Sequence, residues 1–559
     1  MIRPHDSGQL RKERGAFFTP QAIANYLADW AVAGDSESKV LDPTCGEAVF
    51  LLAAGKRLKA LGRDASELDE QLFGVDLHDS SLNFAQGLLE AEGLDARLIP
   101  SDFFELNTPN QLGSRIPYVD AVIGNPPFVR YQVHSGDARA RSREAALRQG
   151  VRLSGLASSW AALLLHSCGF LKPKGRLAMV LPAELLTVGY AEPVRQWLKS
   201  RFEQVHLVLF DRLQFDDATE KVVLVLAKGE GGCDAFSLYY LDDSDDLANI
   251  RPMENLSVTP AANGKWTDLL LPNRQRQLFK QVTSQHFSAL SAYGIPELGT
   301  VTGSNAYFVL DEDTRLKYGL VESTHVKKVC PPGTKHLKGL SFTLGQWAVL
   351  RDAGERVWLL HPSAKDSSEE LENYIQLGQR TGVPEAYKCT VRNPWWRPPV
   401  VAPPDLFFTY MSHRYPRLIA NTARTTFVNS MHGVRLLSDA PSAARQALPL
   451  LAFNSVTMLG AEIFGRSYGG GILKMEPSEA ALLPVPHYSA LEESWAILSQ
   501  ERQTLNNQLL QGRWTNVVKI VDDALLVKTL GLSKGDVTEL HEAARSLRAK
   551  RIGRGTAGN

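Results

Sequence analysis

Short apolar runs alternate with amphipathic stretches over roughly the first 240 residues of the chain. The apolar runs have the length of β-strands and lie at Lys39–Asp42, Gln71–Asp76, Ala96–Pro100, Tyr118–Ile123, Gly175–Leu181, Gln204–Asp211 and Val222–Lys228. The stretches between them have helical spacing, as in Ala48–Leu61, Ser80–Glu92 and Ser158–Leu171. Strands that alternate with helices predict βαβ units, and therefore a mostly parallel sheet with helices on both faces.

The repeating pattern ends, or nearly ends, at a glycine-rich break at Gly229–Cys233. From about residue 245 onward the chain has short strand-like runs, turns and proline-rich loops. Helical spacing returns near the C-terminus, in Leu491–Gln511 and Asp522–Arg551. These changes predict an α/β domain at 1–243, a connecting segment at 244–290, an α+β domain at 291–490 and a helical region at 491–559.

The residues after the fourth predicted strand carry the most specific chemistry, because ligands of parallel sheets bind at the carboxyl ends of the strands. This strand is followed by Asn125, Pro126, Pro127 and Phe128. The Asn125 side-chain oxygen and the Pro126 carbonyl can each accept an N–H of an amine on a planar ring, which localises the nitrogen lone pair for attack. The prolines fix the loop, and the Phe128 ring can stack on a base. The alternative is an ordinary Asn-Pro turn.

The ends of the first two predicted strands offer groups that match a nucleoside carrying an amino acid. Gly46 allows a ligand to approach the backbone closely, and Asp42 can bind an ammonium group. Cys45 belongs to the same ligand loop, where we expect a small buried residue. Asp76 ends the second strand, and a carboxylate there can bind both hydroxyls of a ribose.

The third predicted strand is followed by Asp102 and Phe103. Asp102 can accept the amino group of an adenine, and Phe103 can pack on its ring. Each carboxylate could alternatively be a strand-end cap. One such match is weak, but four successive strand ends that match the parts of S-adenosylmethionine and an acceptor amine are a strong signal.

These residues resemble those of a known family, the N6-adenine DNA methyltransferases of the gamma order, which is the TaqI-like group of restriction–modification enzymes. The resemblance rests on Arg14–Pro20, on the segments around Asp42, Asp76 and Asp102, and on Asn125–Phe128. It implies a Rossmann-like class I S-adenosylmethionine-dependent methyltransferase domain, followed by an α+β target-recognition domain and a helical C-terminal tail. It also implies S-adenosyl-L-methionine as the cofactor and double-stranded DNA as the substrate.

The resemblance further implies roles for Thr19 and Phe215. Thr19 lies in a Phe-Thr-Pro segment that holds the methionine carboxylate in the family, and Phe215 loosely matches an aromatic residue of the base pocket, which it would share with Phe128. From the residues alone, Thr19 could also be the N-cap of a helix at Gln21–Ala33, with Pro20 at the first helical position.

The chain departs from the family pattern at three positions. Glu47 and Ala48 stand where the family commonly has a small residue and a glycine. Ala48 is small enough for the backbone to pass a ligand, whereas Glu47 could repel the methionine carboxylate or face the amino group. Phe128 replaces the commoner tyrosine, but stacking requires only the ring.

Arginines cluster in two segments, and each segment has six arginines against two acidic residues. In Arg392–Asp439 aromatic residues are interleaved, which suits contacts with phosphates and bases. We therefore favour this segment over Arg130–Arg152 as the DNA-binding region, against the plain alternative of a solvated loop. The predicted DNA-binding residues are Arg392, Arg397, Arg414, Arg417, Arg424 and Arg435. The basic residues of Arg545–Arg554 are expected on a solvated helix end.

Composition limits the possible classes of protein. Among 559 residues, 61 basic residues balance 61 acidic residues. This balance excludes a histone-like or uniformly basic nucleic-acid-binding protein but not local basic patches. Five scattered cysteines without a C-x-x-C pair predict neither a disulfide framework nor a cysteine zinc site, and no metal is expected. There is no apolar run of roughly 18 residues, so we expect a cytoplasmic protein without a membrane span.

The resulting prediction is a site-specific DNA methyltransferase that modifies the N6 amine of a flipped adenine in duplex DNA. A restriction–modification or phage-defence system is the expected context, and a cognate restriction endonuclease could be a partner. Two alternatives stay open at this point. The enzyme could methylate another amine, such as protein glutamine or guanine in ribosomal RNA, or the chain could be a DNA-binding modification subunit with little activity of its own.

Overall fold

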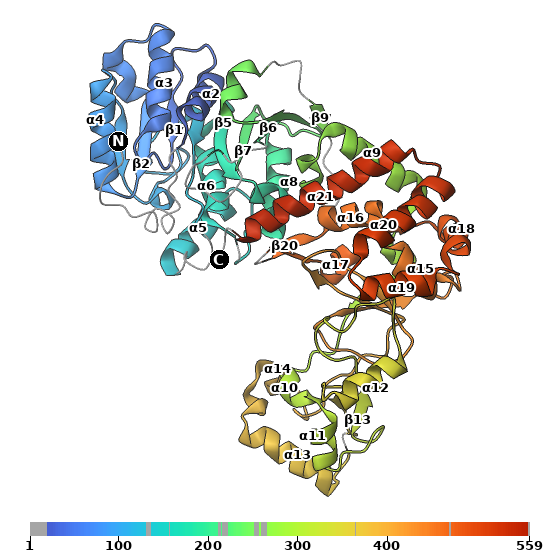
Figure 1. The fold of residues 1–559 in the computed structure, drawn as a ribbon. Helices are drawn as coiled ribbons and strands as arrows, with labels where there is room; N and C mark the ends of the chain where they lie inside the picture. Colours follow the sequence, from blue (N-terminus) through green and yellow to red (C-terminus); the bar gives the residue numbers. More distant parts are fainter. Residues whose placement is uncertain are drawn as a thin grey trace. The chain divides into compact units, whose positions relative to one another are not determined.

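The computed structural model describes residues 19–129, 136–155, 157–210, 214, 222–250, 256–258, 265–363, 365–468 and 471–556. The chain forms two compact units, Met1–Leu270 and Leu271–Asn559. Figure 1 traces the elements of both units along the chain by colour.

The first unit is built on a sheet whose described strands have the order β3-β2-β1-β4-β5-β7-β6-β8-β9. The strands are β1 Val40–Asp42, β2 Leu72–Asp76, β3 Arg97–Pro100, β4 Val119–Gly124, β5 Leu171–Pro182, β6 Gln204–Phe210, β7 Val222–Lys228, β8 Phe236–Leu241 and β9 Leu256–Val258. Neighbouring strands from β3 to β5 pair in parallel, whereas β7 is antiparallel to both β5 and β6. The predicted parallel sheet is thus confirmed.

Both faces of this sheet are buried, because successive residues of the central strands point into two different cores. On β4, Val122 belongs to one core while Ala121 and Ile123 belong to the other. Such strands are near-continuously apolar, which is the pattern of a parallel sheet covered on both sides. The two prolonged apolar runs at β5 and β7 follow the same alternation.

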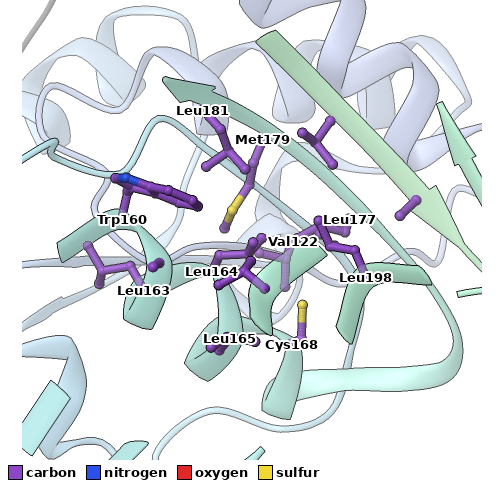
Figure 2. Close-up of a cluster of buried hydrophobic side chains, with 14 of the residues drawn as sticks. Val122, Trp160, Leu163, Leu164, Leu165, Cys168, Leu177, Met179, Leu181 and Leu198 are labelled. Atoms are coloured by element: carbon purple, nitrogen blue, oxygen red, sulfur yellow. The ribbon is translucent and has the colours of Figure 1, made fainter. Parts of the chain in front are cut away.

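Helices from different parts of the unit cover the two faces. The helices α2 Gln21–Val32, α3 Val49–Ala60 and α4 Asp79–Ala91 contribute to one core. The other core includes residues of α5 Gly136–Arg148, α6 Ser159–Ser167, α7 Glu184–Thr187 and α8 Glu192–Arg201. Figure 2 shows this second core, with Val122, Leu177, Met179 and Leu181 on the sheet side and Trp160, Leu163, Leu164 and Leu198 on the helix side.

Three sequence expectations need correction in this unit. The helix expected at Gln21–Ala33 begins at Gln21 after an N-cap at Pro20, not Thr19, because Pro20 has an extended ψ of 139°. The helix expected to reach Leu171 ends earlier, and β5 already begins there. The glycine break at Gly229–Cys233 does not end the sheet, since the chain turns there through positive φ angles and then adds β8 and β9.

The second unit contains several small sheets. A five-stranded sheet among the described residues has the order β11-β19-β16-β18-β14. Its strands are β11 Gly294–Leu298, β14 Ser341–Phe342, β16 Leu406–Phe408, β18 Leu418–Asn421 and β19 His432–Leu436. Smaller sheets are formed by β10 Phe287–Ala289 with β22 Pro484–Pro486, by β12 Val309–Leu310, β15 Trp358–Leu360 and β13 Val326–Lys328, and by β17 Met411–Ser412, β21 Ile472–Lys474 and β20 Arg466–Tyr468.

Helices surround these sheets and form the C-terminal part of the unit. They are α9 Asn273–His286, α10 Asn305–Phe308, α11 Glu312–Lys317, α12 Leu344–Asp352, α13 Glu369–Arg380, α14 Tyr387–Thr390, α15 Ala444–Leu451, α16 Ser455–Phe464, α17 Pro477–Ala480, α18 Tyr488–Leu498, α19 Arg502–Leu510, α20 Trp514–Asp522 and α21 Lys534–Thr556. Among the described residues no single helix is long and apolar enough to span a membrane, although α15 and α16, bent by 81°, pass that test as a pair.

The boundaries of the second unit differ from the predicted divisions of the chain. Helix α9 lies in the predicted connecting segment, yet it packs on α21 from the predicted helical region. The strand pair β10 and β22 also joins the predicted connecting segment to the end of the predicted α+β domain. From Leu271 onward, the rest of the connecting segment therefore shares one compact unit with the α+β part and the C-terminal helices, whereas residues 244–270 belong to the first unit.

The C-terminal helix corrects another expectation. Arg551 of α21 is only 5% exposed, and its guanidinium pairs with the carboxylate of Glu462 on α16, with an N–O distance of 2.8 Å. Arg551 is therefore held in the protein interior, which corrects the expectation of a solvated helix end at this position of the charge run. Arg551 also donates to the backbone carbonyls of Gly471, His413 and Arg414.

Candidate active site

The predicted site residues gather at the carboxyl ends of four adjacent strands in the first unit. Parallel pairing places the end of β1 beside both β2 and β4, and the end of β2 beside β3. Asp42 and Gly124 are in direct proximity, because a Cβ added to Gly124 would lie 2.8 Å from Asp42 Oδ1. Gly124 has a φ of 155°, so both its conformation and the space around it require glycine.

Asp42 is a fully buried carboxylate with one satisfied oxygen. Oδ1 accepts the backbone N–H of Thr44 at 3.1 Å, whereas Oδ2 has no hydrogen-bond partner among the described residues. Burial raises the pKa of Asp42 to about 8, and the neighbouring charge of Asp76 adds to this effect, while the Thr44 N–H opposes it. An isolated buried carboxyl takes up a proton unless a cation is brought to it.

This burial predicts that ligand binding is linked to proton release. If Asp42 binds an ammonium group, its pKa must fall from about 8 on binding, so about one proton should be released below that pH. The affinity for S-adenosylmethionine should then rise by up to about tenfold per pH unit between about pH 6 and about pH 7. Calorimetry in buffers of different ionisation enthalpy measures the released proton directly.

The control for this linkage is Asp42→Asn, which cannot ionise. The variant should bind more weakly than the wild type near neutral pH, without proton release from this position. A wild-type binding enthalpy that does not depend on the buffer would contradict the assignment of Asp42 to the ammonium group.

The loop between β1 and α3 is folded around Gly46 and Ala48. Cys45 N–H donates to the carbonyl of Val75 at 2.8 Å, and Gly46 N–H donates to Asp76 Oδ2 at 3.1 Å. Gly46 has a φ of 49°, and a Cβ there would project into open space, as expected where a ligand approaches the backbone. Ala48 has a φ of 61°, the left-handed conformation that explains the glycine of the family pattern.

Cys45 is buried in this loop, as the sequence predicted. Its sulfur lies close to Gly74 of β2, where an added Cβ would approach Sγ to 2.9 Å. Burial, together with the charges of Asp42 and Asp76, raises the pKa of the Cys45 thiol well above its ordinary value. The thiol therefore stays protonated and fills space beneath the ligand loop.

Asp76 and Asp102 both bind backbone groups at strand ends. Asp76 Oδ1 accepts the N–H of His78 at 2.8 Å, so both of its oxygens hold turns while the side chain stays partly exposed. Asp102 Oδ1 accepts the N–H of Phe104 at 3.0 Å, and Oδ2 pairs with Arg141 of α5 at 3.0 Å. The ligand roles of both carboxylates stay predictions, and Arg141 is a neighbour that the sequence did not indicate.

Phe103 is only 4% exposed and is part of the core beneath the sheet end. Its ring packs against His166 at 4.9 Å and Phe170 at 5.4 Å between ring centroids. Burial lowers the pKa of His166 to about 4, so this histidine is neutral at physiological pH. The predicted contact of Phe103 with an adenine ring stays a prediction, and most of its ring already contacts protein.

The loop after β4 presents one unsatisfied acceptor. Asn125 Nδ2 donates to Thr19 Oγ1 at 3.2 Å, and Asn125 Oδ1 is buried without a hydrogen-bond partner among the described residues. Thr19, 106 positions earlier in the chain, thus orients the amide of Asn125. Pro126 is buried, Pro127 and Phe128 are half-buried, and the Phe128 ring packs against residues of both cores.

Ser159, the first residue of α6, ties down the far side of this loop. Its hydroxyl donates to the carbonyl of Pro127 and accepts the N–H of Val129 at 3.0 Å. Its own N–H donates to the carbonyl of Val129 at 3.1 Å. The sequence reasoning missed Ser159, although a serine before an apolar helical run is a recognisable helix-start signal. Phe215, the other predicted pocket aromatic, lies outside the described residues.

The six predicted DNA-binding arginines lie in different environments of the second unit. Arg392 donates to the carbonyls of Val301 and Thr302, each at 3.1 Å, and Arg397 donates to the carbonyl of Pro362 at 2.8 Å. Arg435 pairs with Glu297 at 2.7 Å. No carboxylate pairs with Arg414, Arg417 or Arg424 within the part of the chain that the structure describes. The contacts of all six with DNA stay predictions.

Two family models match consecutive parts of the sequence. Residues 6–255 match the N-6 DNA Methylase family, and residues 263–526 match the C-terminal domain of the type II methyltransferase M.Eco57I. The chain belongs to the type II DNA methyltransferases. These are the modification enzymes of restriction–modification systems, so the recognition made from the motifs is confirmed at this level.

Individual relatives of the methyltransferase match over most of its length. It is 24% identical to the type II methyltransferase M.AccI of Acinetobacter calcoaceticus over 482 residues, which cover 84% of each chain. It is 25% identical to M.XamI of Xanthomonas campestris pv. amaranthicola over 492 residues, or 86% of each chain. Its fold is similar to that of the type IIL restriction–modification enzyme MmeI, solved in complex with DNA, with a TM-score of 0.52, 13% identity and coverage of 97% and 80% of the two chains.

S-adenosyl-L-methionine is the cofactor of the methyltransferase. Two features of the strand ends fit this molecule: the unpartnered buried oxygen of Asp42, and the open space in front of Gly46. When bound, the cofactor supplies an electrophilic methyl group. Among the described residues, no group of three or more His, Cys, Asp or Glu side chains is placed to hold a metal ion.

Proposed function

We propose that this methyltransferase modifies the N6 amine of adenine at a specific sequence in duplex DNA, as a member of the gamma order. The name of the family that matches residues 6–255, N-6 DNA Methylase, supports adenine as the target base. The order of the motifs supports the gamma assignment, because the cofactor segments around Asp42, Asp76 and Asp102 precede Asn125–Phe128.

A single observation carries the proposal: Oδ1 of Asn125 is buried and has no hydrogen-bond partner in the described part of the chain. A buried acceptor without a partner costs about 1–3 kcal/mol, so such an atom is retained where a ligand supplies the missing donor. The donor in this proposal is an N–H of the target amine. The carbonyl of Pro126, next in the loop, accepts the second N–H, and the two acceptors together localise the lone pair on nitrogen.

The other residues of the first unit position the two reactants. Asp42 and Gly46 hold the amino acid part of the cofactor, with Thr19 near its carboxylate, and Cys45 supports the loop from below. Asp76 binds the ribose hydroxyls. Asp102 and Phe103 contact the cofactor adenine. Because the ring faces of Phe103 are buried, this contact involves the small part of Phe103 that stays exposed.

The target adenine must leave the duplex to reach Asn125, at a cost of a few kcal/mol. Phe128 supplies a stacking face for the flipped base, and Phe215 is proposed as the second aromatic of the same pocket. The second unit reads the DNA sequence and offsets the cost of flipping through its contacts. M.AccI and M.XamI are named as type II methyltransferases, which supports a cognate restriction endonuclease as partner.

Product analysis tests the choice of base. Unmethylated plasmid DNA is incubated with the enzyme and radiolabelled S-adenosylmethionine, digested to nucleosides and analysed by mass spectrometry. We expect N6-methyladenine, and methylation-sensitive sequencing of the same DNA should place it in one sequence context. A product of 4-methylcytosine would refute the adenine assignment while leaving amine methylation standing.

Ser159→Ala tests whether the loop must be fixed for catalysis. Because the hydroxyl bridges Pro127 and Val129, its loss should lower kcat about tenfold, the effect of roughly 1.4 kcal/mol of lost positioning. The KM for S-adenosylmethionine should stay near wild type. Ser167→Ala is the matched control, since among the described residues that hydroxyl donates to the carbonyl of Leu163 in the same helix, at 2.6 Å, and to no loop residue. Equal kcat values for the two variants would argue against a positioning role for Ser159.

A further inference from the structure

A basic pocket of about 550 Å³ lies in the second unit. Three segments line it: residues 334–338 after β13, residues 409–417 around β17, and residues 509–514 between α19 and α20. The side chains that matter for its chemistry are Lys335, Lys338, His413, Arg414, Arg417 and Trp514. None of the described residues that line the basic pocket is an aspartate or a glutamate.

The cations of the basic pocket are poorly compensated. Lys335 pairs with Glu355 at 2.9 Å, but Lys338, Arg414 and Arg417 have no ion pair among the described residues. Arg417 is half-buried, and burial lowers its pKa to about 10 without any carboxylate to oppose the shift. A buried cation without a counter-charge costs free energy, which an anionic ligand can recover.

The guanidinium groups are held in place before any ligand arrives. Arg414 and Arg417 both lie over the indole ring of Trp514, at 5.7 and 5.2 Å from its centroid. The backbone of Arg417 is fixed by Thr409, whose hydroxyl accepts the Arg417 N–H at 2.9 Å. The carbonyl of Arg414 also accepts a hydrogen bond from Arg551. Little conformational entropy is therefore lost when these groups bind an anion.

We propose that the basic pocket binds a backbone phosphate of the DNA duplex, independently of its base sequence. This proposal rests on the proposed function, because that function identifies DNA as the polyanion that the pocket binds. A phosphate group fits because guanidinium forks bind its oxygens in pairs, while Lys338 adds a compact charge at the rim. The site assigns the C-terminal helices a part in DNA binding, since Trp514 begins α20.

The pocket also divides the six arginines of the predicted DNA-binding segment. Arg392, Arg397 and Arg435 already bind carbonyl groups or a carboxylate within the unit, which leaves fewer of their N–H groups available for a phosphate. Arg414 and Arg417 instead line an open pocket in which the structure describes no acidic residue. We therefore assign the phosphate contact to Arg414 and Arg417, with the neighbouring Lys338.

The test measures DNA affinity against salt concentration. A fluorescein-labelled duplex is titrated with the full-length protein without cofactor, at several salt concentrations, for the wild type, Arg417→Gln and Lys338→Gln. Each variant should bind about tenfold more weakly at low salt. The slope of log Kd against log salt should also fall by about one unit for each lost phosphate contact. Both effects should be the same for duplexes with and without the methylated sequence.

Lys519→Gln is the matched control, because it removes a cation from the exposed surface of α20 outside the pocket. Its salt slope should equal that of the wild type. Lys338 is exposed, so Lys338→Gln tests the pocket even if Arg417→Gln destabilises the fold. Salt slopes that match the wild type in both pocket variants would overturn the proposal.

A second measurement separates a DNA phosphate from a free phosphate. Calorimetric titration with inorganic phosphate should show no saturable binding in the millimolar range. Saturable binding that Arg417→Gln abolishes, combined with unchanged DNA salt slopes, would assign the pocket to a small phosphate ligand and refute the DNA assignment.

The outcome does not depend on the base that is methylated, because binding is measured without turnover. If the product is not N6-methyladenine but the pocket variants still show a smaller slope of log Kd against log salt, the proposed function fails and the phosphate site stands. If the product is N6-methyladenine and the slopes are unchanged, only the phosphate site fails.

Discussion

Replacing Asn125 by alanine is expected to slow methyl transfer to DNA by at least about a hundredfold in a single turnover. The buried Oδ1 of Asn125 has no hydrogen-bond partner among the residues that the structure describes, so we expect it to act when an amine is present. The hydrogen bond strengthens as charge develops on the attacking nitrogen, and such an interaction lowers kcat with little effect on ground-state binding. The carbonyl of Pro126 is unchanged by the substitution and can still accept one N–H of the amine, so part of the rate enhancement remains.

The measurement is radiolabelled methyl transfer to duplex DNA with enzyme in excess, accompanied by the equilibrium affinities for DNA and cofactor. Both affinities should stay near wild type. Asn25→Ala is a matched control in the same unit, because that amide is exposed on α2 and its one hydrogen bond among the described residues is accepted from Gln21, at 2.8 Å. Methyl transfer by Asn125→Ala at the wild-type rate would contradict a catalytic role for Asn125.

The strand ends could be predicted from the sequence because the signal there is local. Most of the strands β1 to β7 contain an apolar run of strand length, and the residue that follows each run can be read directly from the sequence. Parallel pairing then brings Asp42, Asp76 and Asn125 to one edge of the sheet, whatever the details of the helices. The cofactor and the reaction class follow from that edge.

The partners of those residues could not be predicted, because they are distant in sequence. Thr19 and Asn125 lie 106 positions apart, and Ser159 is more than thirty positions beyond the loop that it holds. No periodicity links such positions, since each contact depends on where α2 and α6 pack on the sheet. The helix-cap alternative for Thr19 failed for a more local reason, because the extended ψ of Pro20 moves the helix start by one residue.

Charge runs were the least reliable signal in the second unit. The sequence shows which residues are charged but not which of them already have partners. Arg392 and Arg435 already have internal partners, whereas no carboxylate pairs with Arg417 among the described residues. The basic C-terminal run contains Arg551, which proved to be buried against Glu462. A count of net charge therefore indicated a binding region but could not separate binding residues from structural ones.

Arg551→Ala should destabilise the second unit by about 3–5 kcal/mol, because it leaves the carboxylate of Glu462 buried without its partner. Both guanidinium contacts to that carboxylate are 2.8 Å long, and the two side chains are 5% and 2% exposed. Hydrogen exchange of peptides from α16 and α21 measures the loss within this unit. Arg545→Ala, an exposed arginine on the same helix, should change stability by less than about 0.5 kcal/mol.

The pH dependence of this variant identifies the buried charge as the cause. Burial raises the pKa of Glu462, and the loss of Arg551 removes the hydrogen bond and the charge that oppose this shift. A carboxyl whose folded pKa lies above its unfolded value stabilises the fold below the unfolded pKa, and this stability is lost as pH rises through the folded pKa. Arg551→Ala should therefore lose more stability at about pH 8 than at about pH 5.

The double substitution Glu462→Met with Arg551→Met removes both charges and should recover most of the loss. A double variant as unstable as Arg551→Ala would show that the contacts of Arg551 with the carbonyls of Gly471, His413 and Arg414, and not the ion pair, hold the end of α21 in place.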